Sequence, residues 1–174
     1  MALARPTPTQ TERVMNDEDF IVSKTDPRGI ITYGNKIFIE ISGYEEPELL
    51  GAPHAILRHP DMPRAIFKLL WDTIQSGREI NAYVKNLAKD GSFYWVFANV
   101  TPSFDARDGV VGYHSVRRKP KAGAIQVVST LYQSMLDIER RTGNGQDGMK
   151  ASKALLDRTL QEKGVAYDEF VLGL

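Results

Sequence analysis

The stretch from residue 79 to residue 118 restricts the fold more than any other part of the sequence, because it predicts three β-strands joined by tight turns. Residues 89–92 (Lys-Asp-Gly-Ser) are a hairpin turn of the Asp-Gly type, and residues 105–109 make a second turn that ends in glycine. Strands joined by such short turns are antiparallel neighbours. We therefore expect an antiparallel meander with strands over 79–87, 93–103 and 110–118.

A second hairpin is predicted upstream, followed by a short helix. The β-rich run over 20–25 ends at 26–29 (Asp-Pro-Arg-Gly), a strong turn signal, and a strand resumes over 29–33. Asn35 is then suited to cap a short helix, and Gly43 is suited to end it.

Two further helical pieces complete the segment between the hairpins. One turn is expected over 46–51, and a longer amphipathic helix is expected from Pro63 to about Ser76, where apolar residues recur at three- and four-residue intervals. Two strands, then helices, then three strands predict an α+β protein whose antiparallel sheet carries helices on one face. Helices that cover a sheet in this way enclose a pocket.

The chain divides into three expected regions. Residues 1–19 lack strand or helical periodicity and form a flexible N-terminal arm, and residues 20–119 form the folded domain. Residues 120–174 form a C-terminal helical extension. Its expected elements are two helices and a short apolar terminal piece, at 125–141, 149–163 and 165–172.

Two patterns that resemble ligand motifs are rejected. The stretch 143–148 matches G-x-G-x-x-G, but a dinucleotide fingerprint follows a buried strand, and this one follows a charged helix. We interpret it as a flexible loop. His54, His59 and His114 lack the spacing of a metal site, and no catalytic set can be argued from spacing. We expect neither a metal nor an enzyme.

The composition limits the classes of function. Lys plus Arg (22) equals Asp plus Glu (22), and the basic run 117–119 is interpreted as a solvated strand end, so no nucleic-acid partner is indicated. The absence of cysteine excludes disulfides, iron–sulfur clusters and a flavin–cysteine adduct. No run approaches the roughly 20 apolar residues that cross a bilayer, and no export signal is present, so we expect a soluble, cytoplasmic protein.

The segment 57–63 (Leu-Arg-His-Pro-Asp-Met-Pro) concentrates polar groups between two prolines that fix the backbone. Arg58 and His59 are suited to bind a phosphate or a polar ring edge. Asp61 is suited to accept from a ribose hydroxyl, to orient Arg58, or to cap the following helix. A rigid loop capped by Asp61 is the alternative interpretation, and it leaves Arg58 and His59 unexplained.

The two tryptophans, Trp71 and Trp95, allow two interpretations. Large aromatic side chains are usually core residues. Alternatively, they line an apolar cavity and stack on a flat ligand. The sequence alone favours neither interpretation.

Residues 20–119 resemble the PAS domain of bacterial aerotaxis receptors. The matching stretches are 30–35 (Ile-Ile-Thr-Tyr-Gly-Asn), 41–44 (Ile-Ser-Gly-Tyr), 51–54 (Gly-Ala-Pro-His), 58–63 (Arg-His-Pro-Asp-Met-Pro), Trp71 before Gly77, and 90–96 (Asp-Gly-Ser-Phe-Tyr-Trp-Val). The stretch 58–63 is the most specific to the aerotaxis branch, whereas the Asn…Ser-Gly-Tyr and Asp-Gly…Trp elements are common to many PAS domains.

The resemblance implies a five-stranded antiparallel sheet with a helical face and a cavity that holds FAD, whose redox state follows respiration and oxygen. It also implies, position by position, which residues contact or shape the cofactor site. These residues are Asn35, Arg58, His59, Asp61 and Trp71, with Asn86 and Trp95 as weaker assignments on the sheet side.

The resemblance further implies a sensor that reports to a signalling partner. Because the membrane and signalling segments of the receptors are absent from this chain, we expect a separate sensor subunit that docks on a partner or forms a homodimer. The C-terminal helices supply the expected contact. The expected contact surface is the apolar stripe of Val128, Leu131, Tyr132 and Met135. The alternative is that this stripe folds back on the sheet.

Two alternatives stay open at this point. One is a haem-binding gas sensor, in which His59 is the first candidate for axial ligand and His114 the second. The other is a cofactor-free PAS module whose cavity is filled by side chains and which acts only through protein contacts.

Overall fold

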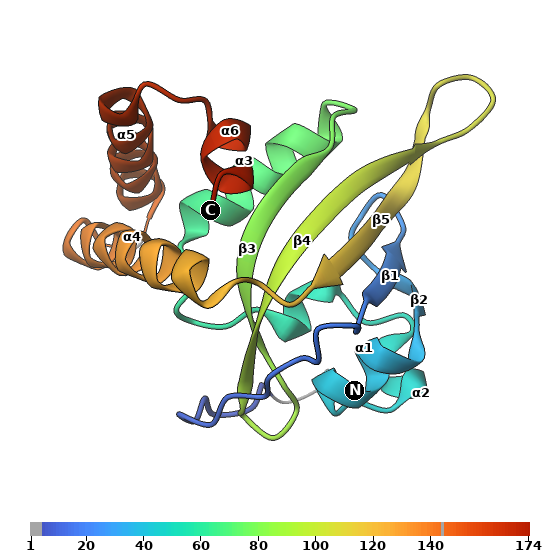
Figure 1. Ribbon diagram of the computed structural model, residues 1–174. Helices are drawn as coiled ribbons and strands as arrows, with labels where there is room; N and C mark the ends of the chain where they lie inside the picture. Colours follow the sequence, from blue (N-terminus) through green and yellow to red (C-terminus); the bar gives the residue numbers. More distant parts are fainter. Residues whose placement is uncertain (1–4, 144) are drawn as a thin grey trace.

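The computed structural model describes residues 5–143 and 145–174 (Figure 1). The described part contains five strands and seven helical segments, of which η1 is a 3₁₀-helix. In chain order they are β1 (Ile21–Thr25), β2 (Ile31–Gly34), α1 (Lys36–Ser42), α2 (Glu46–Leu49), η1 (His54–Leu57), α3 (Arg64–Gln75), β3 (Ile80–Leu87), β4 (Phe93–Phe104), β5 (Val110–Arg118), α4 (Ala122–Arg141), α5 (Gln146–Lys163) and α6 (Tyr167–Leu172).

The five strands form one sheet in the order β2-β1-β5-β4-β3, and every neighbouring pair is antiparallel. The meander β3-β4-β5 and the hairpin β1-β2 are both as predicted. Pairing of β1 with β5 joins them, so the first and last strands lie side by side at the centre of the sheet (Figure 1). The expected α+β class with a five-stranded antiparallel sheet is confirmed.

Asn35 shows how the sequence builds the start of the helical segment. Its side-chain Oδ1 accepts from the backbone N–H of Phe38 (3.1 Å) and of Val22 (3.0 Å), and its Nδ2 donates to the carbonyl of Phe20 (2.7 Å). The first bond caps α1, as predicted. The other two attach the helix cap to β1. Asn35 therefore fixes where the helical segment leaves the sheet.

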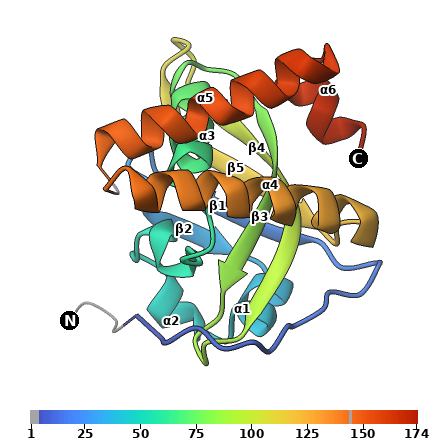
Figure 2. The same ribbon diagram turned by 90° about the vertical axis from the view of Figure 1, so that its left-hand side faces the viewer.

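The helices divide between the two faces of the sheet. Side chains alternate along a strand, and Val84 and Ala98 face the cavity under α3, whereas Trp95 faces the opposite side and contacts Tyr132 of α4. Tyr132 also donates from its hydroxyl to the backbone carbonyl of Tyr83 in β3 (2.8 Å). The C-terminal extension therefore packs α4 on the outer face of the sheet, near the β3 edge (Figure 2).

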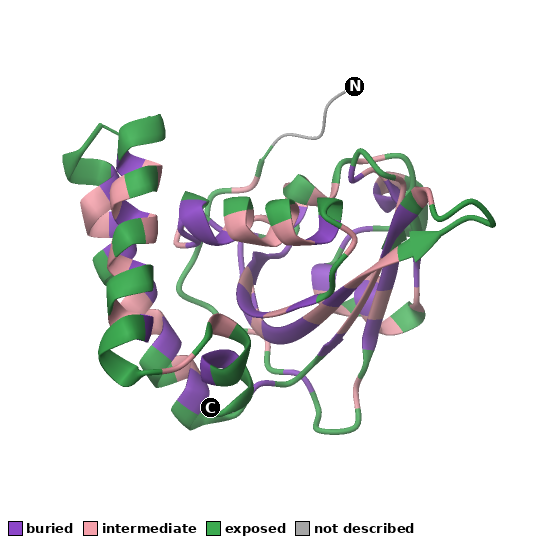
Figure 3. Ribbon diagram, turned by 90° about the horizontal axis from the view of Figure 1, so that it is seen from above, coloured by how far each residue is buried: buried purple, intermediate pink, exposed green. Residues whose placement is uncertain are grey.

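Burial of the apolar stripe on α4 corrects one expectation. Val128, Tyr132 and Met135 are at most 5% exposed within this single chain, and Leu131 is partly buried against the same core (Figure 3). The stripe folds back on its own domain, because the outer face of β3 and β4 presents aromatic side chains that need a cover. It is not an exposed docking surface.

The N-terminal segment lies across the tip of the β3–β4 hairpin (Figure 1). The backbone N–H of Thr9 donates to Gly91 (2.7 Å), and the backbones of Thr11 and Arg13 pair with Phe93. A Cβ at Gly91, whose φ is +87°, would lie 2.1 Å from the carbonyl oxygen of Thr7, so this close approach requires glycine. The flexibility of residues 1–19 stays a prediction, and residues 1–4 lie outside the described chain.

A buried carboxylate attaches the C-terminal extension to α3. Glu139 of α4 is 2% exposed, and its two carboxylate oxygens accept from the backbone N–H groups of Arg64 (3.0 Å) and Ala65 (3.1 Å). These are orphan donors at the start of α3, where a negative charge is favourable. The residue at the cap position, Pro63, makes no side-chain cap. Asp61, one candidate for this cap, instead pairs with Lys85.

We predict that Glu139→Ala lowers the free energy of unfolding by about 2 kcal/mol, because two buried N–H groups lose their acceptor. Urea denaturation of the purified variant measures the change. Glu162→Ala, which removes an exposed carboxylate on α5, serves as the matched control and should change stability by less than about 0.5 kcal/mol. Equal effects of the two substitutions would show that the cap does not stabilise the fold.

Candidate functional site

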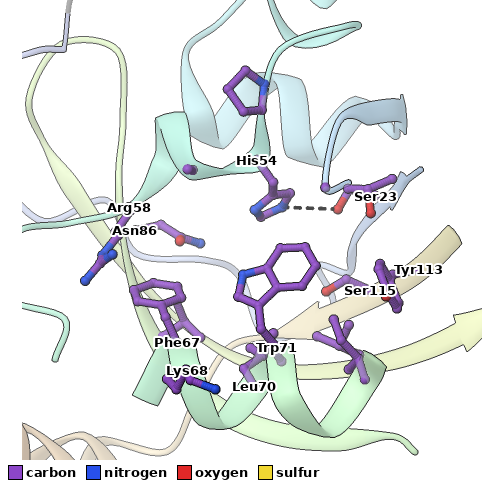
Figure 4. A pocket seen from close by; sticks show the side chains of 18 of the residues that line it. Ser23, His54, Arg58, Phe67, Lys68, Leu70, Trp71, Asn86, Tyr113 and Ser115 are labelled. Carbon is purple, nitrogen blue, oxygen red and sulfur yellow. Dashed lines mark hydrogen bonds between the residues drawn. The ribbon is translucent and has the colours of Figure 1, made fainter. Parts of the chain in front are cut away.

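A cavity of about 390 Å³ lies between α3 and the inner face of the sheet. Its walls come from β1, β3, β4 and β5, from α3, and from the segment around η1. Figure 4 shows side chains from these elements pointing toward one another across this space. The expected pocket under the helical cover is therefore present, and one residue of α5, Met149, also lines it.

One side of the cavity is apolar and aromatic. Phe67 and Trp71 project into the cavity from α3 (Figure 4), and Val84 and Ala98 of the sheet also line it. The Trp71 ring also makes an edge contact with Tyr113, with centroids 5.6 Å apart and planes at 85°. A Cβ at Gly29, where φ is +82°, would come within 2.8 Å of the Trp71 indole, so the turn before β2 needs glycine at this contact. This side of the cavity therefore presents an aromatic and aliphatic surface.

Four polar residues form a cluster at the other side, hereafter the Arg117 cluster: Ser23, His54, Ser115 and Arg117. The Arg117 guanidinium donates from Nε to Ser115 Oγ (2.9 Å), and from Nη2 to Ser23 Oγ and His54 Nε2 (2.9 Å). It also lies 5.2 Å from the ring centroid of Phe38. Its Nη1 has no hydrogen-bond partner among the described residues.

The charges in this cluster follow from burial. Burial lowers the pKa of Arg117 to about 10, so the guanidinium, which is 3% exposed, still carries its charge at neutral pH. Burial, and then the Arg117 charge, lower the pKa of His54 to about 3. His54 is therefore neutral, and its Nε2 accepts the hydrogen bond from Arg117 while its proton resides on Nδ1.

Four more cations surround the cavity and are named here the basic rim: Arg28, Arg58, Arg64 and Lys68. Arg28 pairs with Asp26 (2.9 Å), Lys68 pairs with Asp72, and the Arg58 guanidinium lies 4.4 Å from the Phe67 ring centroid. No acidic residue stands among the described residues that line the cavity. The cavity therefore has a positive lining with an apolar floor.

Three of the residues proposed from the sequence line the cavity: Arg58, Trp71 and Asn86. Asn86 is 4% exposed and points into the cavity from β3 (Figure 4). Arg58 and Asn86 also face each other in an isolated antiparallel bridge, so the segment after η1 runs along the edge of β3. The structure thus brings together one cation, one aromatic wall and one amide of the predicted set.

The other four lie elsewhere. Asn35 caps α1, and Trp95 lies on the outer face with its ring 6.3 Å from that of Tyr132. His59 is 3% exposed and contacts the Phe93 ring, and its Nδ1 accepts from the backbone N–H of Asp61 (3.1 Å). Their assignment to the cofactor site stays a prediction that this geometry does not support by direct contact.

A compact ion pair explains the position of His59 and Asp61. The Asp61 carboxylate binds Lys85 Nζ at 2.7 Å, and the Lys85 ammonium lies 4.2 Å from the Phe93 ring centroid. Burial, followed by the Lys85 charge, lowers the pKa of His59 to about 4. These residues therefore lock the loop after η1 onto β3 as a largely neutral unit.

Sequence reasoning missed the Arg117 cluster. The basic run 117–119 was interpreted as a solvated strand end, which holds for the exposed Arg118 and Lys119 but is wrong for Arg117. A usable signal was present, because Tyr113, Ser115 and Arg117 alternate along β5 and share one face. That β5 lies at the centre of the sheet, and so turns this face into the cavity, is a tertiary fact.

The histidines bear on the haem alternative. Of the three, only His54 lines the cavity, whereas neither candidate axial ligand, His59 or His114, is among its lining residues. No group of three or more His, Asp or Glu side chains with metal-binding geometry occurs in the described parts of the chain. No helix in the described chain is long and apolar enough to span a bilayer.

A family model described as the PAS fold matches residues 31–117, which is half of the chain. The chain belongs to the PAS family. The cavity described above lies inside this PAS domain, between the sheet and its helical cover. The predicted family is confirmed.

Known relatives of this PAS domain include signalling proteins. It is 38% identical to the aerotaxis receptor of Escherichia coli over 133 residues, which are 76% of this chain and 26% of the receptor. It is 30% identical to the nitrogen fixation regulatory protein of Klebsiella pneumoniae over 56% of this chain and 20% of that protein. The chain thus spans about a quarter or less of the relatives it matches.

Among solved structures, a light-oxygen-voltage domain studied with a flavin analogue superposes with a TM-score of 0.56 at 22% identity. The match covers 66% of this chain and 86% of that domain. At this identity the likeness establishes the fold alone.

The depressed pKa of His54 gives a pH-dependent stability. The unfolded chain binds a proton on this histidine near pH 6.5, whereas the folded chain does so only near pH 3. Stability is therefore fully present above pH 6.5 and falls below it, by about 1.4 kcal/mol per pH unit for one histidine. We predict a smaller slope between pH 5.5 and 4.5 in His54→Gln, measured by urea denaturation. Identical slopes in variant and wild type would contradict a buried neutral His54.

Proposed function

We propose that this PAS domain binds FAD in the cavity under α3 and reports the redox state of the cofactor to a signalling partner. The observation that carries the proposal is the chemistry of the described lining: aromatic and aliphatic side chains, a buried guanidinium and a basic rim without any acidic residue. A planar ring with a doubly charged phosphate tail has the complementary chemistry. Similarity to the aerotaxis receptor supports the same ligand.

The size of the cavity fits part of such a ligand. At about 390 Å³ it lies near the lower end of the ~300–1,000 Å³ typical of ligand pockets. It is suited to enclose the flavin ring, and the rest of the dinucleotide would lie outward along the basic rim. Cations with strong donors, such as Arg58, suit the phosphate oxygens.

Each lining group has a role in holding this ligand. Phe67 and Trp71 provide stacking surfaces against Val84 and Ala98, and exclude water from the ring. The Asn86 amide both donates and accepts, so it matches a ring edge that presents a carbonyl beside an N–H. When bound, FAD supplies a ring that accepts electrons and changes its charge and hydrogen bonding.

The C-terminal extension is placed to respond to the ligand. Met149 of α5 lines the cavity, and Glu139 of α4 holds the first turn of α3, which carries Phe67 and Trp71. A change of charge in the cavity that shifts α3 therefore reaches both helices of the extension. We propose that exposed faces of α4 and α5, and not the buried stripe, contact the partner or a second copy of the chain.

We predict that the purified protein carries a yellow chromophore with flavin absorbance, and that Trp71→Leu lowers FAD affinity about tenfold or more through loss of stacking area. Trp95→Leu is the matched control, because this tryptophan faces α4, and it should leave affinity nearly unchanged. Titration of stripped protein with FAD, followed by absorbance, measures both. Colourless protein that stays colourless after reconstitution with FAD would refute the proposed function.

A further inference from the structure

Among the described cations that line the cavity, Arg117 is the most deeply buried. It is 3% exposed, it donates to two hydroxyls and a neutral imidazole, and it lies over an aromatic ring. No Asp or Glu in the described chain makes an ion pair with it.

A buried cation without a counter-charge is unfavourable unless something else supplies one. Hydrophobic side chains of similar size would fill the same space without this cost. Ser115 and Ser23 hold the guanidinium through Nε and Nη2, so its orientation is fixed while Nη1 keeps an unused donor. Arg117 is thus an oriented, unsatisfied donor in the wall of a cavity, which indicates a ligand atom opposite it.

Burial separates Arg117 from the basic rim. Arg28, Arg64 and Lys68 are exposed, which suits a hydrated phosphate, whereas Arg117 is 3% exposed and lies in the polar cluster across the cavity from the aromatic side chains. A strongly hydrated diphosphate would lose its water at this depth. A ring carbonyl, or a ring oxygen that carries negative charge, loses far less hydration on burial and still accepts a hydrogen bond from a guanidinium.

We propose that Arg117 recognises the ring of the bound ligand, donating from Nη1 to a negatively polarised ring oxygen at the buried end of the cavity. This inference rests on the proposed FAD function and specifies which end of the ligand enters first. The pyrimidine edge of a flavin presents such oxygens, and Asn86 lies in the same cavity to bind the adjoining polar positions. The phosphates then lie outward, at the basic rim.

Two ligands and two matched variants test this assignment. FAD and riboflavin share the ring, but riboflavin lacks the phosphates. Arg117→Met removes the buried charge, and Lys68→Met removes a rim charge of similar side-chain length. We expect Arg117→Met to weaken both ligands by the same factor, about tenfold or more. Lys68→Met should weaken FAD and leave riboflavin binding unchanged. Fluorescence titration of protein freed of bound cofactor measures the affinity of each of the two ligands for the wild type and for both variants.

Stability of the ligand-free protein separates recognition from a structural role. Arg117→Met removes an uncompensated buried charge, so we expect its thermal midpoint without ligand to equal or exceed that of the wild type. A purely structural arginine would lower it. If Arg117→Met does not fold, Ser115→Ala keeps the charge and releases Nε from its acceptor, and it should weaken riboflavin severalfold.

The outcomes are distinct. Wild-type protein that binds neither flavin refutes the proposed function itself. Wild-type protein that binds FAD, with riboflavin affinity unchanged in Arg117→Met, or in Ser115→Ala where the first variant is unfolded, overturns only the assignment of Arg117. Binding of FAD without measurable binding of riboflavin also overturns it, because the ring is then not what the buried end recognises.

Discussion

The position of α3 depends on the two hydrogen bonds between its first N–H groups and the buried Glu139 carboxylate. The local sequence supplies no side-chain cap, since Pro63 stands at the cap position, and a residue some 75 positions later in the chain provides it. Because α3 carries the aromatic wall of the cavity, this interaction connects that wall directly to the C-terminal extension. We expect a movement of α3 to be transmitted to α4 through this cap.

The electrostatics in and around the cavity distinguish charged groups that pair with each other from a buried cation without a carboxylate partner among the described residues. Asp61 and Lys85 neutralise each other beside a neutral His59, so they lock the loop after η1 to β3. Arg117 has no carboxylate partner among the described residues, although it is more deeply buried than Asp61 or Lys85. Two neighbouring residues after η1 show the same difference. Arg58 lines the cavity and lies over Phe67, whereas His59 contacts Phe93 outside the cavity lining.

Local patterns predicted the elements well, because hairpin turns and helix caps such as Asp90-Gly91 and Asn35 act over a few residues. The family resemblance predicted the five-stranded antiparallel sheet and three cavity residues. Three features depend on long-range contacts and could not be predicted from the sequence. β1 pairs with β5, and this pairing buries Arg117. Trp95 faces the outer side of the sheet, and the stripe on α4 is covered by that same side. Of the predicted loop 143–148, residues 146–148 instead form the start of α5, and residue 144 lies outside the described chain.

We propose that a ligand bound under α3 changes the mobility of α5, because Met149 of α5 lines the same cavity. Amide hydrogen exchange of the protein with and without bound FAD measures this coupling. We predict slower exchange over 64–75 of α3 and 146–163 of α5 in the bound form, with no change in the exposed β4–β5 turn at 105–109. Unchanged exchange in α3 and α5 while FAD is bound would contradict it.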